Sequence, residues 1–176
     1  PATISRPQSS QKFSTLDYIQ TAWVEIHGEF DDYWAARGKN LRQNMKKQRN
    51  KLASECVDLS FDVIRDTALV GEAIRQYGIL ESASWKSGEG TAVSPGNDQG
   101  LFYKAMLERF CEVGRGVIYR YRFGEQVAAM DLCIESGDML VILKTSYDAS
   151  NKSFSPAFLM REAQRAIDSL EPALVS

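Results

Sequence analysis

The chain has 176 residues, a formal net charge of −2 and a sequence pI near 5.5. This weakly acidic balance argues against a protein that coats nucleic acid or an anionic membrane. Hydrophobic residues make up 44% of the chain, enough for the core of one domain or of two merged half-domains, yet no apolar run approaches the roughly 20 residues of a membrane span.

The N-terminal part is predicted to contain a strand followed by a helix. An apolar run at residues 22–26 predicts the strand. Asp31 or Asp32 is then expected to cap a helix whose apolar residues recur at helical spacing. Gly38 weakens this helix or splits it into two.

A second strand and helix are expected before a long loop. Strict alternation of apolar and polar residues predicts a half-buried strand at 56–64. Asp66 is expected to cap a helix over residues 66–77, and Gly78 to end it. The stretch 81–100 is rich in glycine and serine and is predicted to be a loop.

The C-terminal half is predicted to be a helix, an antiparallel meander and a final helix. Two short turns, at Gly124 and Gly137, separate the three strands of the meander. The expected elements are a helix at 101–113, strands at 117–123, 127–134 and 139–146, and a helix at 156–170. This order predicts an α/β (α+β) fold with helices packed on both faces of a mixed, mostly antiparallel sheet.

The junction after the third meander strand is the strongest candidate site. A buried strand ends near Ser146, a polar loop follows, and a helix begins at Pro156, where proline is favoured. The first amides of a helix bind a phosphate well. Alternatively, Ser153 or Ser155 caps the helix and satisfies those amides internally.

Asp131 is a carboxylate within an otherwise apolar strand and therefore requires a partner. With a two-residue turn at Gly137, Asp131 is predicted to lie on the same face as Lys144. The two side chains form either a structural ion pair or a polar pair that lines a cleft. A change of one residue in the register would place them on opposite faces.

Three further features of the sequence are relevant to function: a basic run, a single histidine and three cysteines. The run from Arg37 to Lys51 carries seven lysines and arginines and no acidic residue; it is either a solvated face or a surface for an anion. The single histidine, His27, has no evident orienting partner, and no nucleophilic triad is recognisable. Cysteines 56, 111 and 133 lack metal-ligand spacing, so we expect free thiols, no metal and a cytoplasmic location.

Several short pieces, in order from about Phe30 to Arg161, together resemble a known family. They are Asn40-Leu41-Arg42-Gln43-Asn44, Lys51-Leu52, Ser84-Trp85-Lys86, Gly90-Thr91-Ala92, Leu143-Lys144, Tyr147-Asp148 and Ser155-Pro156. The set is similar to the GNAT-like acetyltransferases linked to cellulose and exopolysaccharide biosynthesis operons. The resemblance implies acetyl-CoA or another acyl-CoA as donor and an amine or hydroxyl acceptor.

The resemblance also implies residue roles. The strand residues Leu143, Thr145 and Ser146 would line the pantetheine arm, and the helix start at Ser155, Pro156, Ala157 and Phe158 would hold the pyrophosphate. Candidates for catalysis are Tyr147, Asp131 and Lys144, and candidates for substrate binding are Trp85, Lys86 and Thr91 of the loop, where Trp85 either lines a cleft or anchors the loop to the core.

The sequence departs from the GNAT pattern at two places. Residues Asn151 to Pro156 replace the usual Gln/Arg-x-x-Gly-x-Gly/Ala pyrophosphate loop. The chain also stops soon after the cofactor helix, so residues 1–64, with a flexible start at 1–11, could be the tail of a first GNAT-like half and 65–176 the core of a second. An aminoacyl-tRNA donor, a non-catalytic scaffold and a homodimer stay open as alternatives.

Overall fold

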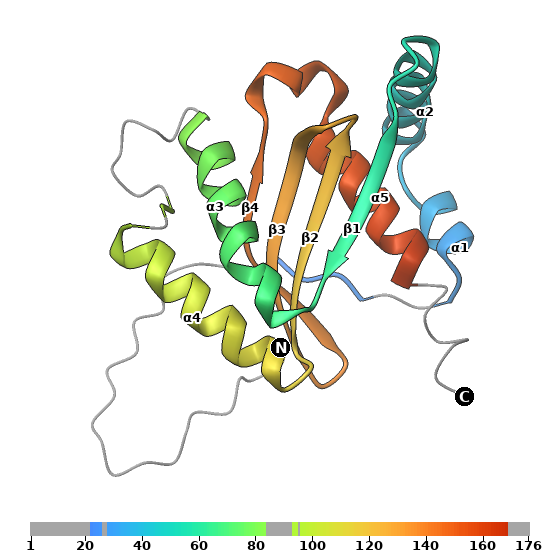
Figure 1. Ribbon diagram of the computed structural model, residues 1–176. Helices are drawn as coiled ribbons and strands as arrows, with labels where there is room; N and C mark the ends of the chain where they lie inside the picture. Colours follow the sequence, from blue (N-terminus) through green and yellow to red (C-terminus); the bar gives the residue numbers. More distant parts are fainter. Residues whose placement is uncertain (1–21, 26–27, 84–92, 95, 169–176) are drawn as a thin grey trace.

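The computed structural model describes residues 22–25, 28–83, 93–94 and 96–168. Figure 1 shows its helices and strands. They are α1 (Phe30–Ala35), α2 (Lys39–Ser54), β1 (Leu59–Ile64), α3 (Thr67–Ala83), α4 (Asp98–Glu112), β2 (Gly116–Phe123), β3 (Gln126–Ser136), β4 (Met139–Tyr147), the 3-10 helix η2 (Ala149–Phe154) and α5 (Pro156–Asp168). No helix in these described parts is long and apolar enough to cross a membrane.

The four strands form one antiparallel sheet in the order β1-β2-β3-β4. Two-residue turns connect β2 to β3 and β3 to β4, as the sequence predicts. Gly124 and Gly137 take φ values of 57° and 63° in these turns, a conformation that glycine adopts without steric cost. The meander therefore forms from local pairing of consecutive strands.

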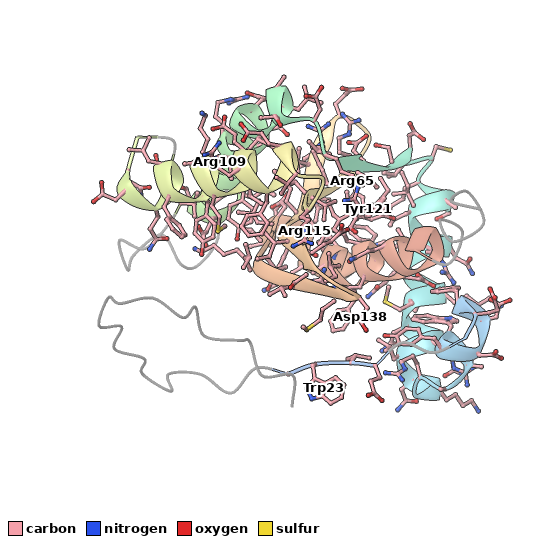
Figure 2. The ribbon with its side chains drawn as sticks, turned by 90° about the horizontal axis from the view of Figure 1, so that it is seen from below. Trp23, Arg65, Arg109, Arg115, Tyr121 and Asp138 are labelled. Atoms are coloured by element: carbon pink, nitrogen blue, oxygen red, sulfur yellow. The ribbon has the colours of Figure 1, made fainter. Side chains whose placement is uncertain are left out.

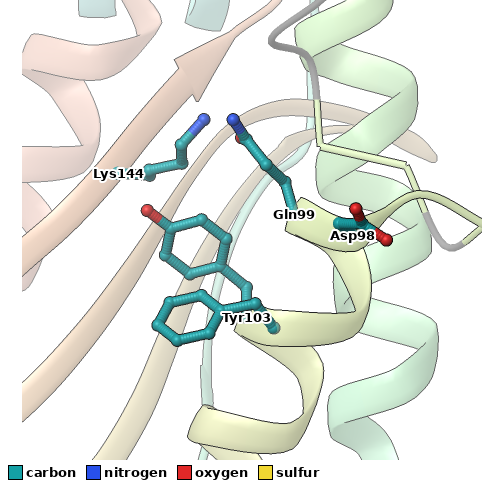
Figure 3. A pocket seen from close by; sticks show the side chains of 5 residues that line it. Asp98, Gln99, Tyr103 and Lys144 are labelled. Atoms are coloured by element: carbon teal, nitrogen blue, oxygen red, sulfur yellow. The ribbon is translucent and has the colours of Figure 1, made fainter.

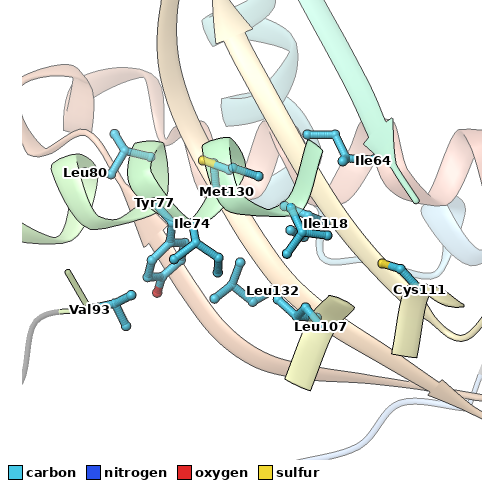
Figure 4. Close-up of a cluster of buried hydrophobic side chains, with 12 residues drawn as sticks. Ile64, Ile74, Tyr77, Leu80, Val93, Leu107, Cys111, Ile118, Met130 and Leu132 are labelled. Atoms are coloured by element: carbon cyan, nitrogen blue, oxygen red, sulfur yellow. The ribbon is translucent and has the colours of Figure 1, made fainter. Parts of the chain in front are cut away.

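Helices cover both faces of the sheet (Figure 1). On one face α3 and α4 pack over alternate residues of β2 and β3, and Figure 4 shows this core around Ile74, Leu107, Ile118 and Leu132. On the other face α2 and α5 pack over an aromatic layer that includes Tyr121, which Figure 2 labels in a view from below. The predicted α/β (α+β) architecture with helices on both faces is confirmed.

Two predictions for the N-terminal part are wrong. Residues 22–25 belong to no strand, and Trp23 is 69% exposed (Figure 2). A short apolar run forms a strand only where a neighbouring strand supplies backbone hydrogen bonds. The strand predicted from residue 56 begins only at Leu59, because Cys56 has a φ of 53° and cannot continue an extended strand. Gly38 does divide the helix, since it lies between α1 and α2.

Gly78 does not end its helix. Helix α3 continues to Ala83, and Gly78 is buried within it. A Cβ atom at Gly78 would lie 2.6 Å from the carbonyl oxygen of Val93, so glycine is present here because another backbone segment passes close by. Helix α4 begins at Asp98, three residues earlier than predicted, because Asn97 caps it by accepting a hydrogen bond from the Gly100 amide at 2.9 Å.

Candidate active site between helix α4 and strand β4

A β-bulge in β4 decides which side chains face which helices. Leu132 lies opposite Lys144, whereas Cys133 lies opposite Ile142, so Leu143 is an extra residue without a partner on β3. Past this point the register is shifted by one residue, and Asp131 faces Thr145 instead of Lys144. The predicted pairing of Asp131 and Lys144 on one face is therefore wrong: the turn is as expected, but the bulge separates them.

Lys144 reaches toward α3 and forms an ion pair with Glu81. The Lys144 Nζ atom lies 3.0 Å from Glu81 Oε1, and Glu81 Oε2 accepts a hydrogen bond from the Val93 amide at 2.6 Å. Glu81 is 2% exposed, so its carboxylate needs both partners. The Lys144 side chain is 21% exposed, so solvent reaches the cationic half of the pair.

This ion pair borders a shallow hollow of about 380 Å³ between α4 and β4. Its walls are Asp98, Gln99, Phe102 and Tyr103 of α4 together with Lys144, and Figure 3 shows the amide of Gln99 and the ammonium of Lys144 pointing toward one another. The Lys144 Nζ atom lies 5.6 Å from the centroid of the Tyr103 ring. An aromatic wall with a few convergent polar groups is typical of a small-molecule site.

Two tyrosines beside Glu81 stay protonated. Burial and the Glu81 carboxylate raise the pKa of Tyr103, and the same two causes raise the pKa of Tyr77 further. Tyr77 is fully buried, and its hydroxyl has no hydrogen-bond partner among the described residues. At neutral pH these phenols can therefore donate hydrogen bonds but cannot act as bases.

The opposite face of the sheet holds a second ion pair. Asp131 is fully buried and pairs with Arg161 of α5 through both carboxylate oxygens. The Thr145 hydroxyl donates to Asp131 Oδ1 at 2.6 Å and accepts from Arg161 Nη2 at 3.0 Å. Two of the predicted site residues, Asp131 and Thr145, thus belong to one hydrogen-bonded network on the α5 face.

The end of β4 is held by Asp148. Its carboxylate accepts hydrogen bonds from the Ser150 amide at 2.8 Å and from Asn151 Nδ2 at 2.9 Å, and its own amide donates to the Ala128 carbonyl. Beside it, Ser146 is buried opposite Met130, whereas Tyr147 lies opposite Ala129 and is 39% exposed. By alternation Tyr147 points to the α5 face and Lys144 to the other.

Helix α5 begins with a strained residue. Ser155 has a φ of 50°, and its carbonyl accepts hydrogen bonds from the Phe158 amide at 2.9 Å and the Leu159 amide at 3.2 Å. Its hydroxyl accepts from Gln48 Nε2 of α2 at 3.0 Å. Because Pro156 has no N–H and the Phe158 amide is used, Ala157 supplies the amide at this helix start that can still reach a ligand.

Of the predicted site residues, only Lys144 lines the hollow. Trp85, Lys86 and Thr91 lie outside the described residues. Glu81 and Tyr103 were not predicted. Glu81 could have been found, because Val70, Ile74, Tyr77 and Glu81 follow helical spacing and the last of these places a carboxylate on a buried stripe.

The family assignment rests on this fold together with one comparison. Residues 39–167, well over half of the chain, match the family model described as Acetyltransferase (GNAT) domain. The chain therefore belongs to the GNAT acetyltransferase family, and the superfamily part of the resemblance is confirmed. It matches none of the curated proteins with which it was compared. Membership of this family supports an acyltransferase-type activity. Among the described residues, no group of three or more His, Cys, Asp or Glu could hold a metal ion.

Proposed function

We propose that the chain is an acyl-CoA-dependent N- or O-acyltransferase whose acceptor binds in the hollow between α4 and β4. The observation that carries this proposal is the bulge at Leu143, which turns Lys144 into the hollow and onto Glu81. Lys144, paired with Glu81 of α3, then lies on the strand that we expect to line the acyl donor.

The donor is proposed to lie along β4. Leu143 has no partner on β3, so its backbone is suited to bond the thioester carbonyl and polarise it. Thr145 and Ser146 continue the same strand, and we place the donor's phosphates near the start of α5, from Ser155 to Phe158. Acetyl-CoA is the simplest donor, and no metal takes part in this proposal.

The acceptor is proposed to attack the thioester directly, without a covalent enzyme intermediate. As the amine or hydroxyl attacks, it must lose a proton, and the leaving thiolate must gain one. Lys144 is proposed to relay the acceptor's proton: its ammonium gives one proton to the Glu81 carboxylate, 3.0 Å away, and takes the proton that the acceptor loses. Tyr147, half-exposed at the end of β4, is a candidate for protonating the thiolate. Asp131 acts only by positioning Arg161 and Thr145.

The test is release of free CoA thiol from acetyl-CoA in the presence of amine and hydroxyl acceptors, including amino sugars and oligosaccharides. We expect Lys144→Met to lower kcat/KM by roughly 10²–10⁴, the range for a positioned proton-transfer group. Lys104→Met is the matched control, because Lys104 lies on α4 but pairs with Glu108 away from the hollow. Full activity of Lys144→Met would contradict the assignment of the site.

The acceptor is proposed to be a saccharide or another cell-envelope precursor, in line with the resemblance to proteins of exopolysaccharide operons. The saccharide arm of the same assay tests this. An aminoacyl-tRNA donor is the second candidate, and the observation that favours it is the exposed basic surface of α2. Binding to tRNA that weakens steeply with salt would support that candidate.

A further inference from the structure

Positive charge in this acidic chain is concentrated on one helix. Helix α2 contains six lysines and arginines and no acidic residue, although the whole chain has a net charge of −2. Its apolar side is occupied, because Met45 and Leu52 are buried against the sheet. Lys46, Lys47 and Lys51 remain exposed to solvent.

Three side chains of α2 join it to the segment that follows β4. Gln48 Nε2 donates to the Ser155 hydroxyl at 3.0 Å, and Lys51 Nζ lies 4.5 Å from the centroid of the Phe154 ring. Arg49 forms an ion pair with Glu162, nearly two turns into α5. The basic helix is therefore fixed beside η2 and the start of α5, although about a hundred residues separate them in sequence.

Several of these groups have unused binding capacity. The Glu162 carboxylate neutralises Arg49, but the Lys51 side chain is 55% exposed and its only ion pair within the described residues is a 3.8 Å contact with exposed Glu55. Lys152 is exposed on η2 itself.

We propose that Lys51 of α2 and Lys152 of η2 bind the phosphate groups at the nucleotide end of the acyl donor. The inference rests on the proposed acyl-CoA function and adds the residues that hold the donor. The segment from Asn151 to Pro156 contains no glycine, so its backbone cannot wrap closely around a phosphate. Side-chain cations from a separate helix provide the contacts that such a loop would otherwise make.

The surface fits the phosphates of a small molecule better than a nucleic acid. Helix α2 has no aromatic residue among its cations, so it offers no platform on which bases could stack. Its contacts go instead to the turn directly after β4, where the proposed thioester arm ends. A long polyanion would need a basic surface that extends further than this turn.

The experiment is calorimetric titration of the full chain with acetyl-CoA, with its analogue lacking the 3′-phosphate, and with S-acetyl-pantetheine, which lacks the nucleotide. The variants are Lys51→Gln, Lys152→Gln and the pair combined. Lys39→Gln is the matched control, because Lys39 is exposed on the same helix about 18 Å from Lys51 by the helical rise. Because all three lysines are exposed, the variants are expected to keep the unfolding temperature of the unaltered chain.

We expect the combined variant to bind acetyl-CoA roughly tenfold more weakly, with a shallower salt dependence, as two exposed charge contacts are removed. Its preference for acetyl-CoA over S-acetyl-pantetheine should fall accordingly, and Lys39→Gln should leave both unchanged. Equal acetyl-CoA affinity in the combined variant and the unaltered chain would overturn the inference while the proposed function stands. Absence of acetyl-CoA binding to the unaltered chain, with binding of tRNA, would overturn both.

Discussion

The two faces of the sheet each bury a carboxylate that pairs with a partly exposed cation, but the surroundings of the two cations differ. On the α3/α4 face, Glu81 is paired with Lys144, whose side chain borders an open hollow. On the α5 face, Asp131 is paired with Arg161, and the Thr145 hydroxyl hydrogen-bonds to both side chains. The first pair lies beside a space for a small molecule, whereas the second joins α5 to the sheet.

The difference arises within two adjacent residues of one strand. Lys144 and Thr145 are neighbours on β4, and each takes its face from the register beyond the bulge at Leu143. Without that extra residue, Lys144 would lie opposite Asp131, and the two would form one pair on the α5 face. A single inserted residue thus places the two cation–carboxylate pairs on opposite faces of the sheet.

The largest expected effect comes from removing the cation of the Asp131–Arg161 pair. Arg161→Met leaves the Asp131 carboxylate buried and unpaired. We therefore expect the free energy of unfolding to fall by roughly 3 kcal/mol. This value is the lower end of the range for broken buried ion pairs, because the Arg161 side chain is a third exposed. Urea unfolding measures this loss. Asp131→Asn combined with Arg161→Met should recover part of it, whereas Lys144→Met should cost less, because Glu81 keeps the Val93 amide. An equal loss in both single variants would remove the distinction between the faces.

A smaller effect is expected at Gly78, which lies on the α3/α4 face. The added methyl group of Gly78→Ala would meet the Val93 carbonyl oxygen at 2.6 Å, and displacing that backbone should cost about 1–3 kcal/mol. Because the Val93 amide holds Glu81, the variant should also lower CoA release at temperatures where it remains folded. Gly38→Ala is the control, since nothing lies within 4 Å of a Cβ there. Unchanged stability of Gly78→Ala would show that the two segments do not pack as described.

The smallest expected effect is a loss of folding stability at alkaline pH, caused by Tyr121 on the α5 face. Burial and the nearby Glu162 carboxylate raise the pKa of Tyr121 to about 12. The unfolded chain deprotonates this phenol near pH 10, so its stabilising contribution is complete below pH 10 and is lost as the pH rises toward 12. Tyr121→Phe should therefore reduce the loss of stability between pH 9 and 11 by about 1 kcal/mol. Parallel pH profiles for both chains would mean that Tyr121 is not shielded from water.

The meander was predictable because its signals are local. Alternating apolar residues and glycine turns specify β2, β3 and β4 to within about two residues, and the apolar spacing of α2 and α3 identifies both helices. The errors occur where a distant segment decides. Gly78 is typical of a helix end in sequence, but it is required because the backbone of Val93 passes beside it. Residues 22–25 have the composition of a strand, but they do not pair with another strand.

The candidate site was harder to predict because it depends on one register shift. The sequence indicates Lys144 but predicts Asp131 as its partner, because no residue pattern around Leu143 distinguishes a bulged strand from a regular one. The sequence also predicts a loop at Glu81, because Gly78 favours an earlier helix end. The Glu81–Lys144 pair therefore depends on the packing of α3 on β4, which the sequence does not reveal.

The bulge at Leu143 also bears on solubility. Within the described residues β4 lies at one end of the strand order, so one row of its backbone donors and acceptors faces away from the sheet. A regular apolar edge of this kind recruits strands from other molecules and promotes aggregation. In β4 the extra residue Leu143 interrupts the hydrogen-bond ladder, and the side chain of Lys144 points inward. Both features make the edge of β4 less regular. The residue that separates the two ion pairs is thus also expected to make this edge a poorer template for strand addition.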